Sequence, residues 1–239
     1  FTGIIAPDQK VIDYLKDRPY APNHKWSDAV NFWNSLYSDK NAIFDEVIEI
    51  DSSQIYPSVS WGLSPEQSIA INDSIPNINE ITNPDKKEEL KSSLIYMGLE
   101  SGQSLMHLPI DAAFIGSCTN ARLDDLRSAA KILKGNKVSP DVLAICTPAS
   151  ADIKRNAERE GIDQIFKDSG FQWREPGCSL CFYAGGEGFL PKQRVITSTN
   201  RNFRGRQGPA VRSHLASPAT VAASAIAGKI IPSIEVCKK

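Results

Sequence analysis

The sequence predicts an α/β fold built around a mainly parallel sheet. Short apolar runs at residues 112–115, 142–145 and 193–197 are each followed by a polar or glycine-containing loop, and helical segments separate them. Alternation of this kind is typical of parallel strands joined by crossover helices. In such sheets, functional side chains gather in the loops beyond the carboxyl ends of the strands.

The first part of the chain predicts two short helices and a strand. Apolar residues recur at helical spacing over residues 11–15 and 26–37, with Pro19 and Pro22 in the turn between them. Residues 44–50 alternate enough to predict a strand. Residues 51–83 are rich in proline, serine and asparagine, which favours a segment that connects two domains, referred to below as the traverse.

Helical patterns then accompany the predicted strands. Residues 88–97 place Leu90, Leu94 and Met97 on one helical face. A helix after the first strand opens with Asp124 and Asp125, whose charges suit a helix N-terminus. Further helices are predicted after residues 147–150 and over residues 218–226.

Composition limits the classes of partner. The chain has 27 basic and 28 acidic residues in 239, with no long run of one sign, so we expect no nucleic acid or anionic membrane partner. No apolar run is long enough to cross a bilayer, and the first residues lack the basic start of a signal peptide. Five cysteines are too few for a disulfide scaffold, which favours a reducing, cytoplasmic location.

Three cysteines lie in polar loops and need an explanation. Cys178 and Cys181 form a C-x-x-C pair, and Cys118 lies 60 residues earlier in a Gly-Ser-Cys-Thr-Asn loop. A zinc site would need a fourth ligand at a usual spacing, and a redox dithiol would leave Cys118 without a purpose. Buried structural thiols are the simplest interpretation of Cys146 and Cys237. A cubane cluster bound by three thiolates keeps one iron open as a Lewis acid.

Residues 198–208 form a second candidate site. They contain three arginines within six positions, Arg201, Arg204 and Arg206. Guanidinium groups match the geometry of carboxylates, and Asn200 and Asn202 could add hydrogen bonds to a bound acid. The alternative is an ordinary surface loop with salt bridges. The histidines at positions 24, 107 and 214 are isolated, and we assign no catalytic residue in this chain.

Together, the motifs GSCTN at 116–120, GCSLC at 177–181 and TNRNFRGR at 199–206 resemble the ordered signature of the aconitase superfamily. Residues 5–8, 14–22 and 59–62 resemble the large subunits of the 3-isopropylmalate dehydratase family more than aconitase itself. The resemblance runs from residue 1 to residue 231 and corresponds to the carboxy-terminal half of such a subunit.

The resemblance implies a function for each motif. Cys118, Cys178 and Cys181 would hold a [4Fe–4S] cluster, and a small hydroxy-dicarboxylate substrate would contact the residues Asn200, Arg201 and Arg206. Arg204 occupies a variable position and receives no role. The implied reaction converts 2-isopropylmalate to 3-isopropylmalate by dehydration and rehydration in leucine biosynthesis, without redox change.

The resemblance also implies partners and domains. The large subunit of the family is about twice this length, so the amino-terminal half, which assists proton and hydroxyl handling, would be missing here. A separate small subunit would supply the base, forming a heterodimer, and this chain alone would be inactive. Residues 1–83 would contain the end of the second domain together with the linker that follows it. Residues 84–239 would form the third domain, which carries the cluster, and each domain would be a three-layer α/β/α unit.

Two other interpretations stay open at this point. The motifs do not separate this family from a citramalate isomerase, a homoaconitase or a dimethylmalate dehydratase. A metal-stabilised regulatory or RNA-binding protein is a second possibility, and the balanced charge counts against it.

Overall fold

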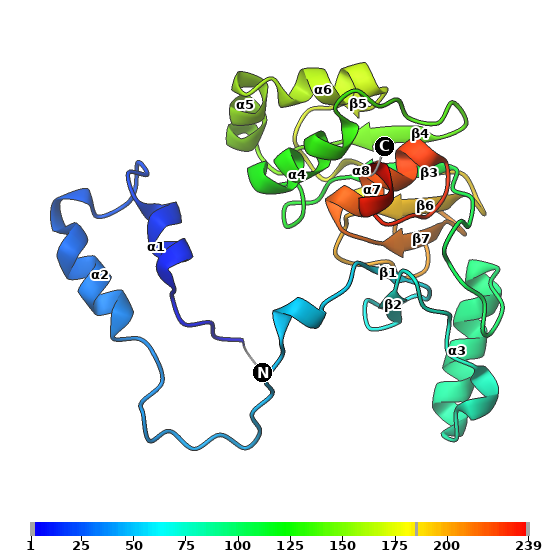
Figure 1. Cartoon of the computed structure of the whole chain (residues 1–239), viewed down its shortest axis with the longest axis horizontal. Coiled ribbons are helices and arrows are strands. Elements are labelled where there is room, and N and C mark those ends of the chain that lie inside the picture. The colour runs from blue at the N-terminus through cyan, green and yellow to red at the C-terminus, as the bar shows by residue number, and fades with distance from the viewer. Residues whose placement is uncertain (1–2, 185, 238–239) are drawn as a thin grey trace. The chain divides into compact units, whose positions relative to one another are not determined.

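The computed structural model describes residues 3–184 and 186–237, and of Cys237 it describes the backbone alone. The chain divides between Ser53 and Gln54 into two compact units. Figure 1 shows their elements in chain order.

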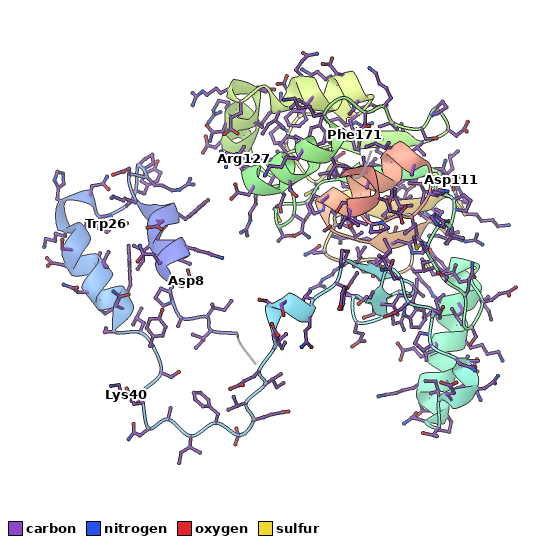
Figure 2. The ribbon with its side chains drawn as sticks, in the orientation of Figure 1. Asp8, Trp26, Lys40, Asp111, Arg127 and Phe171 are labelled. Carbon is purple, nitrogen blue, oxygen red and sulfur yellow. The ribbon has the colours of Figure 1, made fainter. Side chains whose placement is uncertain are left out.

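The first unit contains the two short helices that the sequence predicts. Helix α1 (Gln9–Leu15) begins at Asp8, whose carboxylate accepts a hydrogen bond from the Val11 N–H at 2.9 Å. Helix α2 (Trp26–Asn34) follows a short 3₁₀ turn at η1 (Asn23–Lys25). Figure 2 labels Asp8 and Trp26 at the starts of these helices. Edge-to-face packing of Trp26 on Trp33, with ring centroids 5.6 Å apart, stabilises α2.

The strand predicted at residues 44–50 is wrong. These residues form no regular secondary structure, and Phe44, Val47, Ile48 and Ile50 are each more than half exposed. An alternating pattern favours a strand only when a neighbouring strand supplies the hydrogen bonds of a ladder, and periodicity alone does not provide that neighbour.

The predicted traverse at residues 51–83 is also wrong in part. Strands β1 (Ser58–Ser60) and β2 (Ser68–Ala70) form an antiparallel hairpin between the 3₁₀ helices η2 (Ser52–Gln54) and η3 (Ile78–Glu80). Val59 and Ile71 of this segment are buried in the main core. The hairpin therefore belongs to the second unit, while the expected domain boundary at residue 83 stays a prediction.

A five-stranded parallel sheet forms the centre of the second unit and confirms the α/β prediction. Its strands are β3 (Ala112–Ile115), β4 (Leu143–Cys146), β5 (Gln172–Trp173), β6 (Arg194–Thr197) and β7 (Arg212–Leu215). Their order across the sheet is β5-β4-β3-β6-β7, and every neighbouring pair is parallel. β3 and β6 are buried along their whole length, as is typical of parallel strands.

Six helices complete the second unit within the described residues. They are α3 (Pro84–Met97), α4 (Leu123–Leu133), α5 (Ala151–Arg159), α6 (Ile162–Ser169), α7 (Pro218–Ala227) and α8 (Ile234–Cys237). α3 starts four residues before the predicted helix, because Asn83 caps its N-terminus and Pro84 suits its first turn. None of the helices in the described residues has the length and apolar character needed to cross a membrane.

The two faces of the sheet pack differently. Ala113 and Ile115 of β3 lie in the main core, where α7 packs on β3 and on α4. Phe114 points to the other face, into a second apolar cluster with Leu180 and Phe189. This second cluster anchors the segment that carries the C-x-x-C pair.

Candidate functional site

Three loops follow parallel strands of one sheet. Residues 116–120 follow β3, residues 174–181 follow β5, and residues 198–208 follow β6. Because carboxyl ends of parallel strands meet at one edge, the three loops share that edge. The sequence predicts this for the first and third loops, but β5, with two residues, was too short to detect.

Ser198 joins the Cys118 loop to the arginine loop. The Gly116 N–H donates to its hydroxyl oxygen at 3.0 Å, and that hydroxyl lies within 3.2 Å of the Asn120 carbonyl oxygen. The Asn120 amide in turn donates to the Ser198 carbonyl at 2.7 Å. A Cβ at position 116 would lie 2.2 Å from the Phe114 ring, so only glycine fits there. Cys118 therefore lies on a firmly held loop.

The C-x-x-C pair lies in a tight turn. The Cys181 N–H donates to the Cys178 carbonyl at 2.8 Å, and η4 (Ser179–Cys181) contains Ser179 at φ 41°, which is unfavourable for a side-chain-bearing residue. Cys118 and Cys178 are exposed, Cys181 is half-buried, and all three are free thiols. Exposed or half-buried thiols at a sheet edge are accessible ligands, in contrast to a thiol inside a core.

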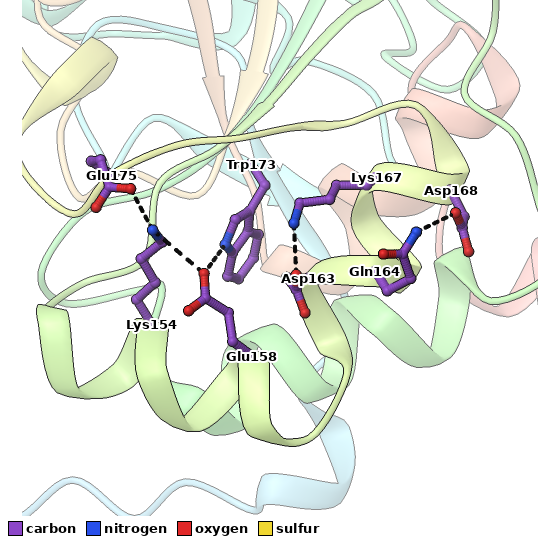
Figure 3. Close-up of polar contacts among 8 residues, drawn as sticks. All are labelled: Lys154, Glu158, Asp163, Gln164, Lys167, Asp168, Trp173 and Glu175. Atoms are coloured by element: carbon purple, nitrogen blue, oxygen red, sulfur yellow. Dashed lines mark hydrogen bonds and ion pairs between the residues drawn. The ribbon is translucent and has the colours of Figure 1, made fainter.

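Ion pairs hold the base of this loop to α5. Figure 3 shows Lys154 between the carboxylates of Glu158 and Glu175, with the Trp173 indole N–H directed at Glu158 at 3.2 Å. The hydrogen bond from Lys154 to Glu175 is the main reason that the pKa of Lys154 is raised. Glu175 lies three residues before Cys178, so this network orients the chain as it enters the turn.

Arg206 lies directly beside the C-x-x-C pair. Its Nη2 is 3.4 Å from the Sγ of Cys181, and its guanidinium lies 5.1 and 5.3 Å from the ring centroids of Phe182 and Phe203. The Arg206 carbonyl accepts from the Tyr183 N–H at 2.8 Å. Its Nε is buried and has no hydrogen-bond partner among the described residues, so the guanidinium keeps an unused donor.

Asn200 and Arg201 are exposed, and the side chain of neither makes a hydrogen bond to another described residue. Both are therefore free to contact a ligand. Asn202 differs, because it is buried and its amide nitrogen lies within 3.2 Å of three oxygens, those of Ser60 Oγ, Gly62 O and Ser213 O. The expectation that Asn202 faces a bound acid is wrong, since its amide nitrogen anchors the loop to β1, to Gly62 after it and to β7.

Arg204 has a structural contact that sequence reasoning missed. Its guanidinium donates to the Ser92 hydroxyl on α3 and lies 5.4 Å from the Tyr96 ring centroid. The Tyr96 hydroxyl accepts from the Gly205 N–H at 3.1 Å. α3 therefore supports the arginine loop through Ser92 and Tyr96.

His214 is buried and hydrogen-bonded at both ring nitrogens. Its Nε2 lies 2.8 Å from a guanidinium nitrogen of Arg194, which can only donate, so Nδ1 carries the proton and donates to the Ser60 carbonyl at 2.6 Å. Desolvation, and next the charge of Arg194, lower the pKa of His214 to about 3. A neutral, fully bonded imidazole agrees with the structural role expected of an isolated histidine.

The arrangement of the cysteines limits the kind of metal site that they can form. Among the described residues, no group of three or more His, Cys, Asp or Glu side chains converges closely enough to hold a single metal ion. The geometry therefore offers no support for a zinc site. Thiolates that bind different irons of a cubane lie further apart than the ligands of one ion. Three free thiols on two loops of one sheet edge are the type of donor that such a cluster takes from a protein.

A cavity of about 660 Å³ lies next to the same edge. Asn120 and Thr199 of the two joined loops contribute to its wall, with Tyr56, Val59 and Leu215 among the apolar residues. Among the residues that the structure describes, no charged side chain lines it. The positive charges at this edge that could match a carboxylate are therefore those of the arginine loop.

Comparisons with known proteins give a consistent answer. The family model described as the aconitase family (aconitate hydratase) matches residues 1–228. The chain is 54% identical over 231 residues to the 3-isopropylmalate dehydratase large subunit of Cupriavidus necator, covering 96% of this chain and 86% of that protein.

Two further relatives are matched over only about half of their own length. The chain is 48% identical over 229 residues to the 3-isopropylmalate dehydratase large subunit 1 of Bradyrhizobium diazoefficiens. This match covers 95% of this chain and 48% of that protein. The chain is 49% identical over 230 residues to the large subunit of Prochlorococcus marinus strain MIT 9312, covering 95% of this chain and 49% of that protein. The chain thus spans about half the length of these two relatives.

Proposed function

Because the chain belongs to the aconitase family, we propose that it is part of the large subunit of a hydro-lyase, a 3-isopropylmalate dehydratase. The proposed reaction is the isomerisation of 2-isopropylmalate to 3-isopropylmalate by dehydration and rehydration, in leucine biosynthesis. The names of the relatives support this choice over other hydro-lyases of the family.

The observation that carries the proposal is the position of Arg206. An anion-binding guanidinium lies 3.4 Å from the thiol of Cys181, and Ser198 ties the same loop to the one that carries Cys118. A site that combines a metal cluster with a carboxylate clamp needs both chemistries within reach of one small molecule.

Cys118, Cys178 and Cys181 would hold the [4Fe–4S] cluster. When bound, such a cluster supplies a Lewis-acidic iron without a protein ligand, which can polarise a substrate hydroxyl or carboxylate. The guanidinium of Arg206 beside Cys181 would offset part of the negative charge of the thiolates.

The chain's own residues would bind and orient the acid. Arg201 and Arg206 each offer a planar fork of donors for a carboxylate, and Asn200 offers an amide for a carboxylate or hydroxyl. Phe182 and Phe203 restrict the guanidinium of Arg206, so less orientational freedom is lost when the substrate binds.

Proton transfer would depend on other parts of the enzyme. The loops at residues 116–120 and 198–208 contain no histidine, aspartate or glutamate. The carboxylate of the loop at residues 174–181, Glu175, is paired with Lys154, so these loops offer no imidazole and no unpaired carboxylate as a base. We propose that the remaining half of the large subunit and a small subunit supply these groups, and that this chain alone is inactive. A reducing, cytoplasmic location would suit the exposed thiols.

Anaerobic reconstitution with iron and sulfide tests the proposal. Cys118→Ala, Cys178→Ala and Cys181→Ala should each lose the visible absorption of the cluster and the paramagnetic signal that appears when dithionite reduces the cluster by one electron. Cys146→Ala is the matched control, because this thiol is buried in β4, and it should retain both.

Substrate class is tested on the same material. 2-Isopropylmalate should shift the paramagnetic signal of the reconstituted cluster more strongly than citramalate, homocitrate or dimethylmalate. A stronger shift with one of these acids would assign a related hydro-lyase instead. A chain that binds zinc but no cluster, or that binds RNA more tightly than the acids, would contradict the proposal. Turnover by the isolated chain would contradict its predicted inactivity.

A further inference from the structure

Gln207 is a buried amide that directly follows Arg206, with 1% of its surface exposed. Its Nε2 donates to the Leu180 carbonyl at 2.9 Å, and its Oε1 accepts from the Ser213 hydroxyl at 2.7 Å. Because a carbonyl only accepts, the amide nitrogen must face Leu180. Both ends of the amide are therefore used, in a fixed orientation.

Leu180 lies between the two cysteines of the C-x-x-C pair. Its side chain is buried in the second apolar cluster, and its carbonyl is held by Gln207, so the turn is fixed from both sides. This matters because Ser179 adopts φ 41°, a conformation that persists only where the surroundings impose it. The Ser179 hydroxyl cannot contribute, since it is buried without a partner among the described residues.

The backbone of residues 206 and 207 fixes the segment after the turn as well. The Arg206 carbonyl accepts from the Tyr183 N–H at 2.8 Å, and the Gln207 carbonyl accepts from the Phe189 N–H at 2.9 Å. The C-x-x-C segment and the arginine loop therefore form one hydrogen-bonded unit, with the Gln207 side chain as its buried polar link.

We infer that Gln207 is a positioning residue, which holds the C-x-x-C turn in register with Arg206. It touches neither a substrate nor the proposed cluster, and acts through the Leu180 carbonyl on Cys178 and Cys181. The inference rests on the proposed function where it treats these cysteines as cluster ligands. The position of the turn itself does not depend on that function.

The test measures alkylation by N-ethylmaleimide in the reduced, cluster-free 239-residue chain, site by site, with peptide mass spectrometry. Cys181 is half-buried and reports on the turn, while exposed Cys118 is a reference in the same molecule. Gln207→Met keeps a neutral side chain of similar length and cannot donate to Leu180. We expect the ratio of Cys181 to Cys118 alkylation to rise about tenfold, since a buried acceptor loses its donor.

Two further variants keep the test decisive. Gln164→Met makes the same change on the exposed surface of α6 and should leave the ratio at the wild-type value. Ser213→Ala removes only the hydroxyl that orients the Gln207 amide, so it is the milder change and should raise the ratio less than Gln207→Met does. Buried Cys146 reports general unfolding.

An unchanged ratio in both Gln207→Met and Ser213→Ala would overturn the inference. An equal rise at Cys118, Cys146 and Cys181 would do the same, because it would show general loosening. In reconstituted material, Gln207→Met should release iron to a chelator several times faster than Gln164→Met and change the line shape of the paramagnetic signal. If wild type binds no cluster, the proposed function fails, while the alkylation ratio still decides the role of Gln207.

Discussion

Asn200 and Asn202 are two residues apart, and the structure predicts opposite consequences for the same substitution. Asn202→Ala should lower the free energy of unfolding, because the amide nitrogen of Asn202 lies 2.7 Å from Gly62 O, 3.0 Å from Ser60 Oγ and 3.2 Å from Ser213 O. Asn200→Ala removes an exposed side chain that makes no hydrogen bond to another described residue.

The magnitude follows from the number of acceptors left without a donor. An amide has two hydrogens, so its three contacts amount to two full hydrogen bonds. The Ser60 hydroxyl can rotate to another partner, but the carbonyls of Gly62 and Ser213 are buried and fixed. At about 1–3 kcal/mol for each of these two unsatisfied buried groups, Asn202→Ala should cost about 2–6 kcal/mol. A water molecule in the vacated space would bring the cost to the lower figure.

Equilibrium urea unfolding, followed by far-ultraviolet circular dichroism, measures this difference. Asn200→Ala should stay within about 0.5 kcal/mol of wild type, as is usual for exposed sites. Asn202→Ala should shift the midpoint to lower urea with an unchanged slope, since the same surface is exposed on unfolding. Equal midpoints for the two variants would refute the assignment of Asn202 as an anchor. In reconstituted material, Asn200→Ala should instead weaken dicarboxylate binding.

Further predictions concern charged groups. The pKa of His214 is lowered to about 3, below its unfolded value of about 6.5, so its contribution to stability is complete above about pH 6.5 and lost as pH falls toward 3. In acid titrations of urea unfolding, His214→Gln should therefore lose less stability than wild type over that window. Arg206→Lys should weaken binding of 2-isopropylmalate about tenfold in calorimetry of the reconstituted protein, since it loses the planar fork. Lys154→Met should change the free energy of unfolding by less than about 1 kcal/mol, because its partner Glu175 is 84% exposed.

The central strands could be predicted from the sequence, and the outer strands could not. β3, β4 and β6 are rich in apolar residues because they are covered on both faces. β7 reads Arg-Ser-His-Leu, which no hydrophobic pattern identifies as a strand. It is stable there because His214 finds a donor in Arg194 and an acceptor in Ser60, 20 and 154 positions away along the chain. Local patterns do not contain partners at such distances.

The same limit explains which site residues could be found. The residues singled out from the sequence, such as Cys118, Cys181 and Arg206, have unusual chemistry, and all lie in loops at the predicted edge of the sheet. Serine, asparagine and glutamine are ordinary loop residues, so the sequence gives no reason to single out Ser198 or Gln207. Their importance follows only from burial and from hydrogen bonds to another loop.

Within residues 198–208, the exposed polar residues and the buried polar residues have different roles. Asn200 and Arg201 are exposed, whereas Ser198, Asn202 and Gln207 are buried and bind other segments. A loop that binds a charged ligand must keep its charged groups in place before the ligand arrives, or it loses affinity when it orders them. Neutral buried amides and hydroxyls provide that order without placing a charge in the core. The motif is therefore a structural unit as much as a ligand-binding one, and a change at each neutral position should disturb the segment that this residue holds, the Cys118 loop for Ser198 and the C-x-x-C turn for Gln207.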